Sequence, residues 1–491
     1  MPVGTAGSGT VESETTTPGD VPAAEWPGSR WPVALVVAGV VALVAVRPLR
    51  DNSFLTHLAT GRILLEDGLP AENPFLYTGT AFPVPSWWWS LLVAGVEAVG
   101  GAAAIRLVTA AITAVLAVVL VRLTRPRQGE PERLLAAVLP PVVALSASFQ
   151  FLSGRPHLLG YLLLALLLVV WWEERSPWWL AAVMVVWVNV HGSWVYGVGI
   201  LVVLVVARAV DDRRIRRGDV LGVGAALAGV VLGGALYPEP FEMLLLPTRQ
   251  FGDSVEREAL QAYKEWAPVG LDLAVLWPLL GLGLVAVLGC VRRRRWAHAL
   301  VVVGLCAFGA SSLRIVPVAA VSLVPFAAEG LRGFGSLRLP GRERARVLGA
   351  LGAASLGAAV VYGCVGPHYD LTWYPVRSVD RLEERGLVGR DGVRVVTPDF
   401  VGNYLEWRYG ADAHAYVDDR PNAATALDYV ELVALGDGWR GALERAEPDV
   451  VLWERAEPLA DELAGDPDWV LAWEDDGFVV LCREELADRC R

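Results

Sequence analysis

The string RPLRDNSFLTHLATGR follows the first apolar run of the sequence and contains an acidic residue, Asp51. A carboxylate at that place can deprotonate an acceptor hydroxyl while basic residues nearby hold an anionic leaving group. His57 and Arg62 follow at helical spacing and are candidate substrate-binding residues. The alternative is that Asp51 merely caps a helix over residues 52–65. We take Asp51 as the candidate catalytic base.

Further ionisable residues stand in breaks between apolar runs: Arg155 and His157 in SGRPH, His191 in VNVHGSW and Arg314 in SSLRIVP. Ionisable residues at membrane depth usually face a cavity or a partner, and arginine binds phosphate through two hydrogen bonds. The alternative for each is a side chain that reaches the membrane surface or a loop carbonyl. We expect these residues to bind substrate in one cavity, together with Asp51 and His57.

Two more segments carry candidate substrate-binding residues. Glu265, in KEWAP, belongs to a long loop over 237–271 that could form a lid on the acceptor side. A packed amphipathic loop is the alternative. Asp419 and Arg420 follow a predicted strand at 413–418, and residues at strand ends often reach a ligand. A structural ion pair is the alternative for them.

The composition places these residues in a membrane protein. The chain has 491 residues, 54% of them hydrophobic and 19% charged, and its mean hydropathy is +0.44. The apolar runs are long enough to span a bilayer, and we count eleven spans. The net charge of -11 lies largely at the two ends and gives no reason to expect a nucleic-acid partner. The expected surroundings are membrane lipid.

The arginine-rich breaks come at alternate connections, in the ranges 122–133, 208–217, 292–295 and 332–346. Because cationic loops stay in the cytoplasm, the N-terminus is predicted to be cytoplasmic. The candidate chemistry then lies on the outer face of the cell membrane.

The sequence divides into three parts. Residues 1–30 predict a disordered cytoplasmic tail, residues 31–365 the transmembrane domain, and residues 366–491 an extracytoplasmic α/β domain. An outer loop over 50–101 contains a tryptophan-rich helix at 86–100, which we place in the membrane interface rather than across it. The five cysteines show no metal-ligand spacing, and Cys482 and Cys490 could form a disulfide outside the cell.

The string DNSFLTHLATGRILLEDGLPAENPFLYT resembles the first outer loop of bacterial multi-spanning proteins with a GT-C glycosyltransferase-like fold. VNVHGSWVYG, YPEPFEMLLLP, LRIVPVAA and VDDRPNAAT continue the resemblance along the chain. Characterised relatives are protein O-mannosyltransferases, aminoarabinose transferases and oligosaccharyltransferases. The resemblance implies a polyprenyl-phosphate-linked sugar as donor and a first-loop acid, here Asp51, as base. Asn52 follows in place of a second carboxylate, so we predict no cofactor; a divalent metal is possible but unsupported.

The predicted fold is therefore a membrane all-α protein of about eleven transmembrane helices with GT-C-like architecture and a small C-terminal extracytoplasmic α/β domain. The predicted function is transfer of a sugar from polyprenyl phosphate to a cell-envelope acceptor, which could be a glycan, a lipid or a protein. The alternative is a non-catalytic membrane protein that binds or transports lipid-linked glycans. A transporter needs polar groups deep in several helices, whereas here they gather on one side.

Overall fold

The computed structural model describes residues 30–79, 82–127, 130, 132–252, 266, 268–270, 274–334, 337–389, 393–420, 423–475 and 477–490. Glu265 and the tail predicted over residues 1–30, apart from Arg30, lie outside these residues, as does most of the loop that was predicted to form a lid.

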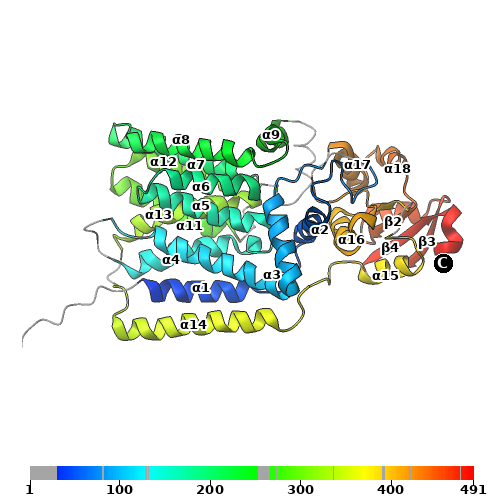
Figure 1. Ribbon diagram of the computed structural model, residues 1–491, viewed down its shortest axis with the longest axis horizontal. Coiled ribbons are helices and arrows are strands. Elements are labelled where there is room, and N and C mark those ends of the chain that lie inside the picture. The colour runs from blue at the N-terminus through cyan, green and yellow to red at the C-terminus, as the bar shows by residue number, and fades with distance from the viewer. Residues whose placement is uncertain are drawn as a thin grey trace, which may run out of the picture.

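Most of the chain forms a bundle of apolar helices that lie side by side (Figure 1). They are α1 (Trp31–Ala45), α3 (Trp87–Leu123), α4 (Leu134–Ala147), α5 (Pro156–Trp172), α6 (Trp178–Val190), α7 (Trp194–Asp212), α8 (Arg217–Gly234), α11 (Leu276–Arg292), α12 (Trp296–Ala310), α13 (Val316–Leu331) and α14 (Arg342–Cys364). Two further helices, α2 (Asn52–Glu66) and α9 (Pro240–Gly252), lie in the polar connections.

The length and composition of these helices show a membrane protein. Among the described residues, five helical segments are long and apolar enough to cross a bilayer: Trp87–Leu123, Trp194–Asp212, Arg217–Gly234, Leu313–Leu331 and Arg342–Cys364. Six other apolar helices have 10–17 residues, which is less than the roughly 20 that a straight span needs. The count of eleven spans therefore stays a prediction.

Helix α3 is kinked at Gly100 and Gly101. Gly101 has a φ of 62° and a ψ of -162°, a backbone conformation that is essentially confined to glycine. The part before the kink runs across the end of the bundle, and the part after it runs along the bundle (Figure 1). The kink falls where the sequence predicts the boundary between an interfacial helix and a span, and the interfacial position stays a prediction.

The C-terminal part carries a four-stranded sheet in the order β1 (Val395–Val396), β2 (Val450–Glu454), β4 (Phe478–Arg483), β3 (Trp469–Glu474). β1 pairs with β2 in parallel, and the other two pairings are antiparallel. The helices of this tail domain are α15 (Val376–Glu384), α16 (Asp399–Tyr409), α17 (Ala423–Ala434), α18 (Trp439–Ala446), α19 (Pro458–Ala464) and α20 (Ala487–Cys490).

One predicted strand of the tail domain is absent from the sheet. Residues 413–418 form no strand. Within this segment Ala415 makes isolated β-bridges to Val395 and to Leu76 of the first loop. This segment instead connects the sheet to the loop.

The first loop lies between the bundle and the tail domain. Buried Phe54 and Leu58 of α2 belong to the same apolar cluster as Val401 and Tyr404 of α16. A methyl group at Gly61 would lie 2.0 Å from the carbonyl oxygen of Ser90, so glycine allows α2 to pack closely on α3. The tail domain therefore rests on α2 at one end of the bundle (Figure 1).

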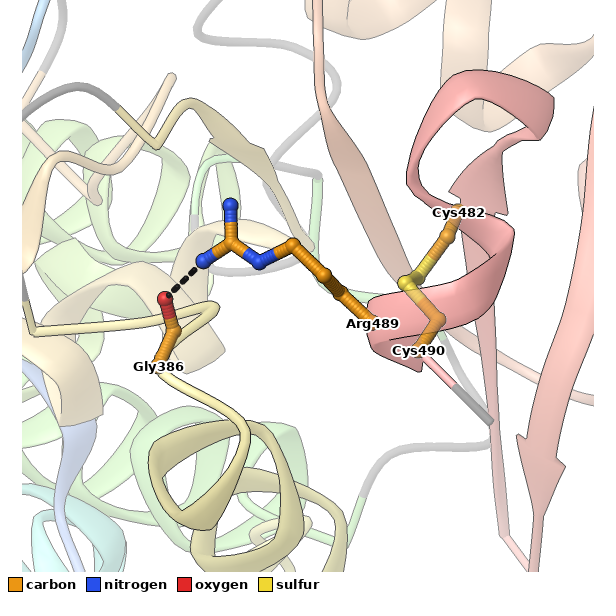
Figure 2. Close-up of a disulfide and its surroundings, with 4 residues drawn as sticks. All are labelled: Gly386, Cys482, Arg489 and Cys490. Carbon is orange, nitrogen blue, oxygen red and sulfur yellow. Dashed lines mark hydrogen bonds between the residues drawn. A yellow bond between two sulfur atoms is a disulfide. The ribbon is translucent and has the colours of Figure 1, made fainter.

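A disulfide joins Cys482, in β4, to Cys490, in α20. Figure 2 shows this bond beside Arg489, which donates a hydrogen bond to the carbonyl oxygen of Gly386 at 3.0 Å. The pairing that the sequence left open is therefore present in the structure. The position of the tail outside the cytoplasm stays a prediction.

We expect denatured, unreduced protein to expose three alkylatable thiols, because Cys290, Cys306 and Cys364 are free. Reduction should expose five. Replacing Cys490 with serine should lower the free energy of unfolding of the tail domain by about 2 kcal/mol, because the C-terminal segment loses its cross-link. Cys364→Ser is the matched control. Mass spectrometry after alkylation provides the count, and five thiols without reduction would contradict the pairing.

Candidate functional site

A cavity of about 1280 Å³ lies between the end of the helix bundle and the tail domain. The first loop, the connections of the bundle and the tail domain all contribute to its wall. Its lining includes the six residues that were predicted to converge: Asp51, His57, Arg155, His157, His191 and Arg314. Their proximity is an observation, and their roles in binding and catalysis stay predictions.

Asp51 is held by partners from the bundle. Arg155 donates to it through Nε, and Ser153 Oγ donates to its second oxygen at 2.9 Å. Arg155 also donates to Asn52 Oδ1 at 2.8 Å. Asp51 occupies the N-cap position of α2, yet its side chain makes no capping hydrogen bond. The capping alternative therefore does not account for this carboxylate, which is instead oriented on the cavity wall.

His57 lies on the α2 face that lines the cavity, together with Ser53, Thr56 and Thr60. Its Nδ1 is 3.1 Å from Ser90 Oγ. Burial, foremost, and the nearby positive charge of Arg420 lower the pKa of His57 to about 3. The ring is therefore neutral at physiological pH, and His57 can act as a hydrogen-bonding group rather than as a cation.

His157 and His191 face each other from neighbouring connections, with ring centroids 6.3 Å apart. His157 Nε2 lies 3.0 Å from the carbonyl oxygen of Phe151, so Nε2 carries the proton and Nδ1 is an acceptor. No described residue donates a hydrogen bond to that buried Nδ1. His191 Nδ1 lies 2.7 Å from Ser193 Oγ. His191 is only half-buried, so its ring can exchange hydrogen bonds with hydroxyl groups in the cavity.

Arg314 brings a guanidinium group to the same wall of the cavity and lies over the ring of Trp266, 5.1 Å from its centroid. A guanidinium group keeps its charge and can bind a phosphate through two hydrogen bonds. Arg314 is therefore suited to an anionic ligand.

The tail domain contributes Asp419 and Arg420. Asp419 accepts a hydrogen bond from Ser53 of α2. Burial raises the pKa of Asp419 to about 6, although Arg155 opposes that shift. Arg420 lines the cavity too, but its guanidinium pairs with Asp418 at 2.8 Å and with Glu406 at 2.5 Å. The structural ion pair considered for this segment is thus present at Arg420.

Arg62 does not line the cavity. It forms an ion pair with Glu97 of α3 at 2.6 Å and donates to the carbonyl oxygen of Trp407 at 3.0 Å. Five helical residues turn the chain by about 140° from His57, so the two side chains lie on different faces of α2. The substrate-binding role predicted for Arg62 has no support in this geometry, which makes it a link between α2, α3 and α16.

The tail domain also presents aromatic and acidic side chains to the cavity that were not predicted from the sequence: Trp373, Tyr374, Asp399, Phe400, Tyr429, Trp453, Glu454 and Glu457. Tyr429 donates a hydrogen bond to Asp399 at 2.9 Å. The density of aromatic residues in the tail was the available signal, but their common orientation depends on the fold.

The described residues offer no ready set of ligands for a divalent metal ion. Within the described part of the chain, no three histidine, cysteine or acidic side chains gather closely enough to coordinate one. Asp51 is already engaged by Arg155 and Ser153. The absence of a cofactor stays a prediction.

No family model and no curated protein matches the sequence. Solved structures do match it. The crystal structure of the Archaeoglobus fulgidus oligosaccharyltransferase tethered with an acceptor peptide containing the NVT sequon has a TM-score of 0.53 and 13% sequence identity over 87% of this chain and 69% of that one. The apo form of that enzyme has a TM-score of 0.48, 12% identity and coverage of 87% and 70%.

The similarity to the tethered enzyme shows that this chain shares an oligosaccharyltransferase fold. It supports the GT-C-like resemblance for the architecture. At 13% identity it carries the fold alone, so the function has to be argued from the cavity.

Proposed function

We propose that this chain is a glycosyltransferase that moves a sugar from a polyprenyl-phosphate donor to a cell-envelope acceptor outside the cytoplasm. The main support is the cavity in which Asp51 meets Arg155, Arg314 and two histidines at the end of a bundle with an oligosaccharyltransferase fold. A carboxylate beside basic groups matches the needs of a reaction that deprotonates a nucleophile and releases a phosphate.

In the proposed reaction Asp51 accepts the proton of the acceptor group while the acceptor atom attacks the anomeric carbon of the donor sugar. The bond from that carbon to the phosphate oxygen breaks, and polyprenyl phosphate leaves with the electron pair. Arg155 is committed to orienting Asp51. We assign the stabilisation of the leaving phosphate to Arg314, which lines the same cavity and can make charge-assisted hydrogen bonds.

The two walls of the cavity differ in charge, which supports an assignment of the substrates to opposite sides. Arginines and histidines come mostly from the bundle and the first loop. The tail domain contributes acidic and aromatic side chains, and the charge of its Arg420 is balanced by buried carboxylates. We infer that the donor phosphate binds on the bundle side and the acceptor on the tail side, where aromatic faces and carboxylates suit sugar rings or hydroxyl groups.

Contacts among the basic loops support the proposed topology. Glu130, in the loop before α4, pairs with Arg293 at 2.5 Å and with Arg332 at 2.8 Å. Arg30, before α1, pairs with Glu132 at 2.5 Å. These loops therefore meet at a single end of the bundle, whereas the tail domain rests on the end where α2 lies (Figure 1). Cationic loops on one side favour a cytoplasmic N-terminus and an outer site.

The test is transfer of a labelled sugar from polyprenyl phosphate in proteoliposomes containing the purified full-length protein. A panel of polyprenyl-phosphate sugars is presented with an extract of cell-envelope glycans, lipids and proteins as acceptor. We expect at least one donor to be consumed and its label to appear in the acceptor fraction. Saturable donor binding without transfer from any donor would favour the binding or transport alternative.

Replacing Arg314 with alanine should weaken donor binding about tenfold or more, because a charge-assisted contact with phosphate is lost. The effect should fall on the KM for the donor more than on kcat. Arg314→Lys keeps the charge and should recover part of the affinity. Equal donor KM values for wild type and Arg314→Ala would remove this arginine from phosphate binding.

A further inference from the structure

A buried arginine, Arg106, lies in α3 after the kink of that helix. Its side chain is 0% exposed, and it does not line the cavity. The proposed reaction gives it no role. A guanidinium group stays charged when it is buried and is costly to leave without hydrogen-bond acceptors. The partners of Arg106 therefore indicate what this residue does.

These partners come from the carboxyl ends of two other helices. Arg106 Nε donates to the carbonyl oxygen of Val46, the C-cap residue of α1, at 2.8 Å. Its two Nη atoms donate to the carbonyl oxygens of Tyr362 and Gly363, in the last turn of α14, each at 3.1 Å. Nη1 also lies 3.4 Å from the carbonyl oxygen of Val365, the C-cap residue of α14. One planar group therefore joins α1 and α14, which lie side by side (Figure 1).

The helix dipole explains why these carbonyl oxygens bind a cation. The last carbonyl groups of a helix have no partner within the helix, and they carry a partial negative charge. Neither α1 nor α14 has a basic residue in its last turn. Arg106 therefore supplies, from α3, a positive charge that stabilises both helix ends.

Close packing brings the helix ends within reach of Arg106. A methyl group at Gly363 would lie 2.5 Å from the side chain of Leu107 in α3 and 2.8 Å from the side chain of Val46. Glycine at this position thus lets the end of α14 approach both α1 and α3.

The chain segments that leave these two helix ends lead to different walls of the cavity. The segment after Val46 leads to Asp51, the proposed base. The segment after Val365 leads to Trp373 and Tyr374, which line the cavity from the tail domain. The distance between the base and the tail-domain wall therefore depends on how the two segments leave the bundle.

The same two segments bind each other beside Arg106. The backbone nitrogen of Leu49 donates to the carbonyl oxygen of His368 at 2.8 Å, and the backbone nitrogen of Asp370 donates to the carbonyl oxygen of Leu49 at 2.9 Å. Arg106 Nη1 lies 3.1 Å from His368 Nδ1. Because arginine only donates hydrogen bonds, His368 Nδ1 is the acceptor. Arg106 therefore holds the two helix ends and also the pairing that follows them.

We propose that Arg106 is a positioning residue for the proposed sugar transfer. By holding the carboxyl ends of α1 and α14 together, it fixes Asp51 relative to the tail-domain wall that contains Trp373 and Tyr374. Because Arg106 lies outside the cavity wall, it acts through Asp51 rather than on a substrate. Its effect on catalysis rests on the proposed function, whereas the positioning itself rests on the hydrogen bonds that Arg106 makes.

Hydrogen exchange measured by mass spectrometry, on the full-length protein in proteoliposomes, tests the positioning without a substrate. Arg106→Met has a side chain of similar length that donates no hydrogen bond. Arg106→Lys keeps the charge on a single nitrogen, which cannot span both helix ends. We expect the amides of Leu49 and Asp370 to exchange about tenfold faster or more in Arg106→Met, because hydrogen bonds from a charged group are lost. The increase should be smaller in Arg106→Lys, and amides within α5 should keep their wild-type rates in both variants.

Arg208→Met is the matched control. Arg208 is also a buried arginine of the bundle, but it pairs with Asp219 at 3.0 Å, so its loss should leave exchange at Leu49 and Asp370 unchanged. The proposal is overturned if both Arg106 variants exchange these two amides at wild-type rates, or if exchange rises equally throughout the bundle. Arg106→Lys decides the question by itself if Arg106→Met does not fold.

Sugar transfer in the same proteoliposomes measures the consequence. Per folded molecule, Arg106→Met should have a kcat lower by about 10², the loss that follows when a catalytic group is misplaced, and Arg106→Lys should recover part of it. The donor KM should change little, because Arg314 is unaltered. An unchanged kcat despite faster exchange would refute the positioning role. If the wild type transfers no sugar, the proposed function fails, while the exchange rates still decide whether Arg106 holds the two segments.

Discussion

Replacing Asp51 with asparagine is expected to lower kcat for sugar transfer by about 10²–10⁴, the range that general-base assistance contributes. Asparagine has nearly the same shape as aspartate but cannot take a proton from the acceptor. It can still accept one hydrogen bond from Arg155 or Ser153, the two partners of the Asp51 carboxylate. Transfer of labelled sugar in proteoliposomes measures kcat, and donor KM should change little.

Two controls separate lost chemistry from lost structure. Asp67 lies exposed at the other end of α2, so Asp67→Asn changes the same residue type away from the cavity and should leave kcat unaltered. The unfolding temperature of Asp51→Asn should remain near that of wild type. Full activity in Asp51→Asn would exclude Asp51 as the base, and the neighbouring Asp419 would become the first candidate to examine.

The convergence of residues on the cavity could be predicted from the sequence for a simple reason. Apolar runs long enough for a membrane force their connections to alternate between two sides, and the arginine-rich connections mark one of them. Arg155, His157, His191 and Arg314 stand in the other connections and therefore reach the same end of the bundle. The alternation of connections does not depend on how the helices pack against one another.

The position of the tail domain could not be predicted in this way. Ser53 and Asp419 are 366 residues apart and meet because α16 packs on α2. Such a contact depends on the shapes of two surfaces, which hydrophobic periodicity does not encode. The same limit applies to the segment over 413–418. Its alternating residues predict a strand, but in the structure its β-pairing consists of isolated bridges at Ala415.

Helical geometry explains why Arg62 lies away from the cavity although His57 lines it. Ser53, His57 and Thr60 follow one another at intervals of four and three residues, the spacing of one helix face, and all three line the cavity. Arg62 lies five residues after His57 and falls on another face. Closer attention to this spacing would have found Ser53 and set Arg62 apart.

Raising the pH through about 6 is expected to increase kcat/KM for sugar transfer in the wild-type protein. Burial raises the pKa of Asp419 to about 6, so this cavity carboxylate becomes charged in that window. It can then accept a hydrogen bond from the hydroxyl group of the acceptor substrate and no longer donates one. His57 cannot cause this rise of kcat/KM with pH, the limb near pH 6, because its pKa is lowered to about 3 and the ring stays neutral throughout. Asp419→Asn should lower transfer at pH 8 and remove the limb near pH 6.

At pH 8 the Asp419→Asn variant should be less active but more stable than wild type. Opposite effects on activity and stability distinguish a functional carboxylate from a structural one. A carboxyl group whose pKa is higher in the folded protein than its ordinary value of 3.8 binds protons more tightly when folded, so its contribution to stability is lost as the pH rises through about 6. Asparagine removes that cost. Asp419→Asn should therefore unfold at a higher temperature than wild type at pH 8, and the difference should shrink toward pH 4. A variant that is less stable at pH 8 and keeps the wild-type pH profile would show that Asp419 only holds the tail domain to α2.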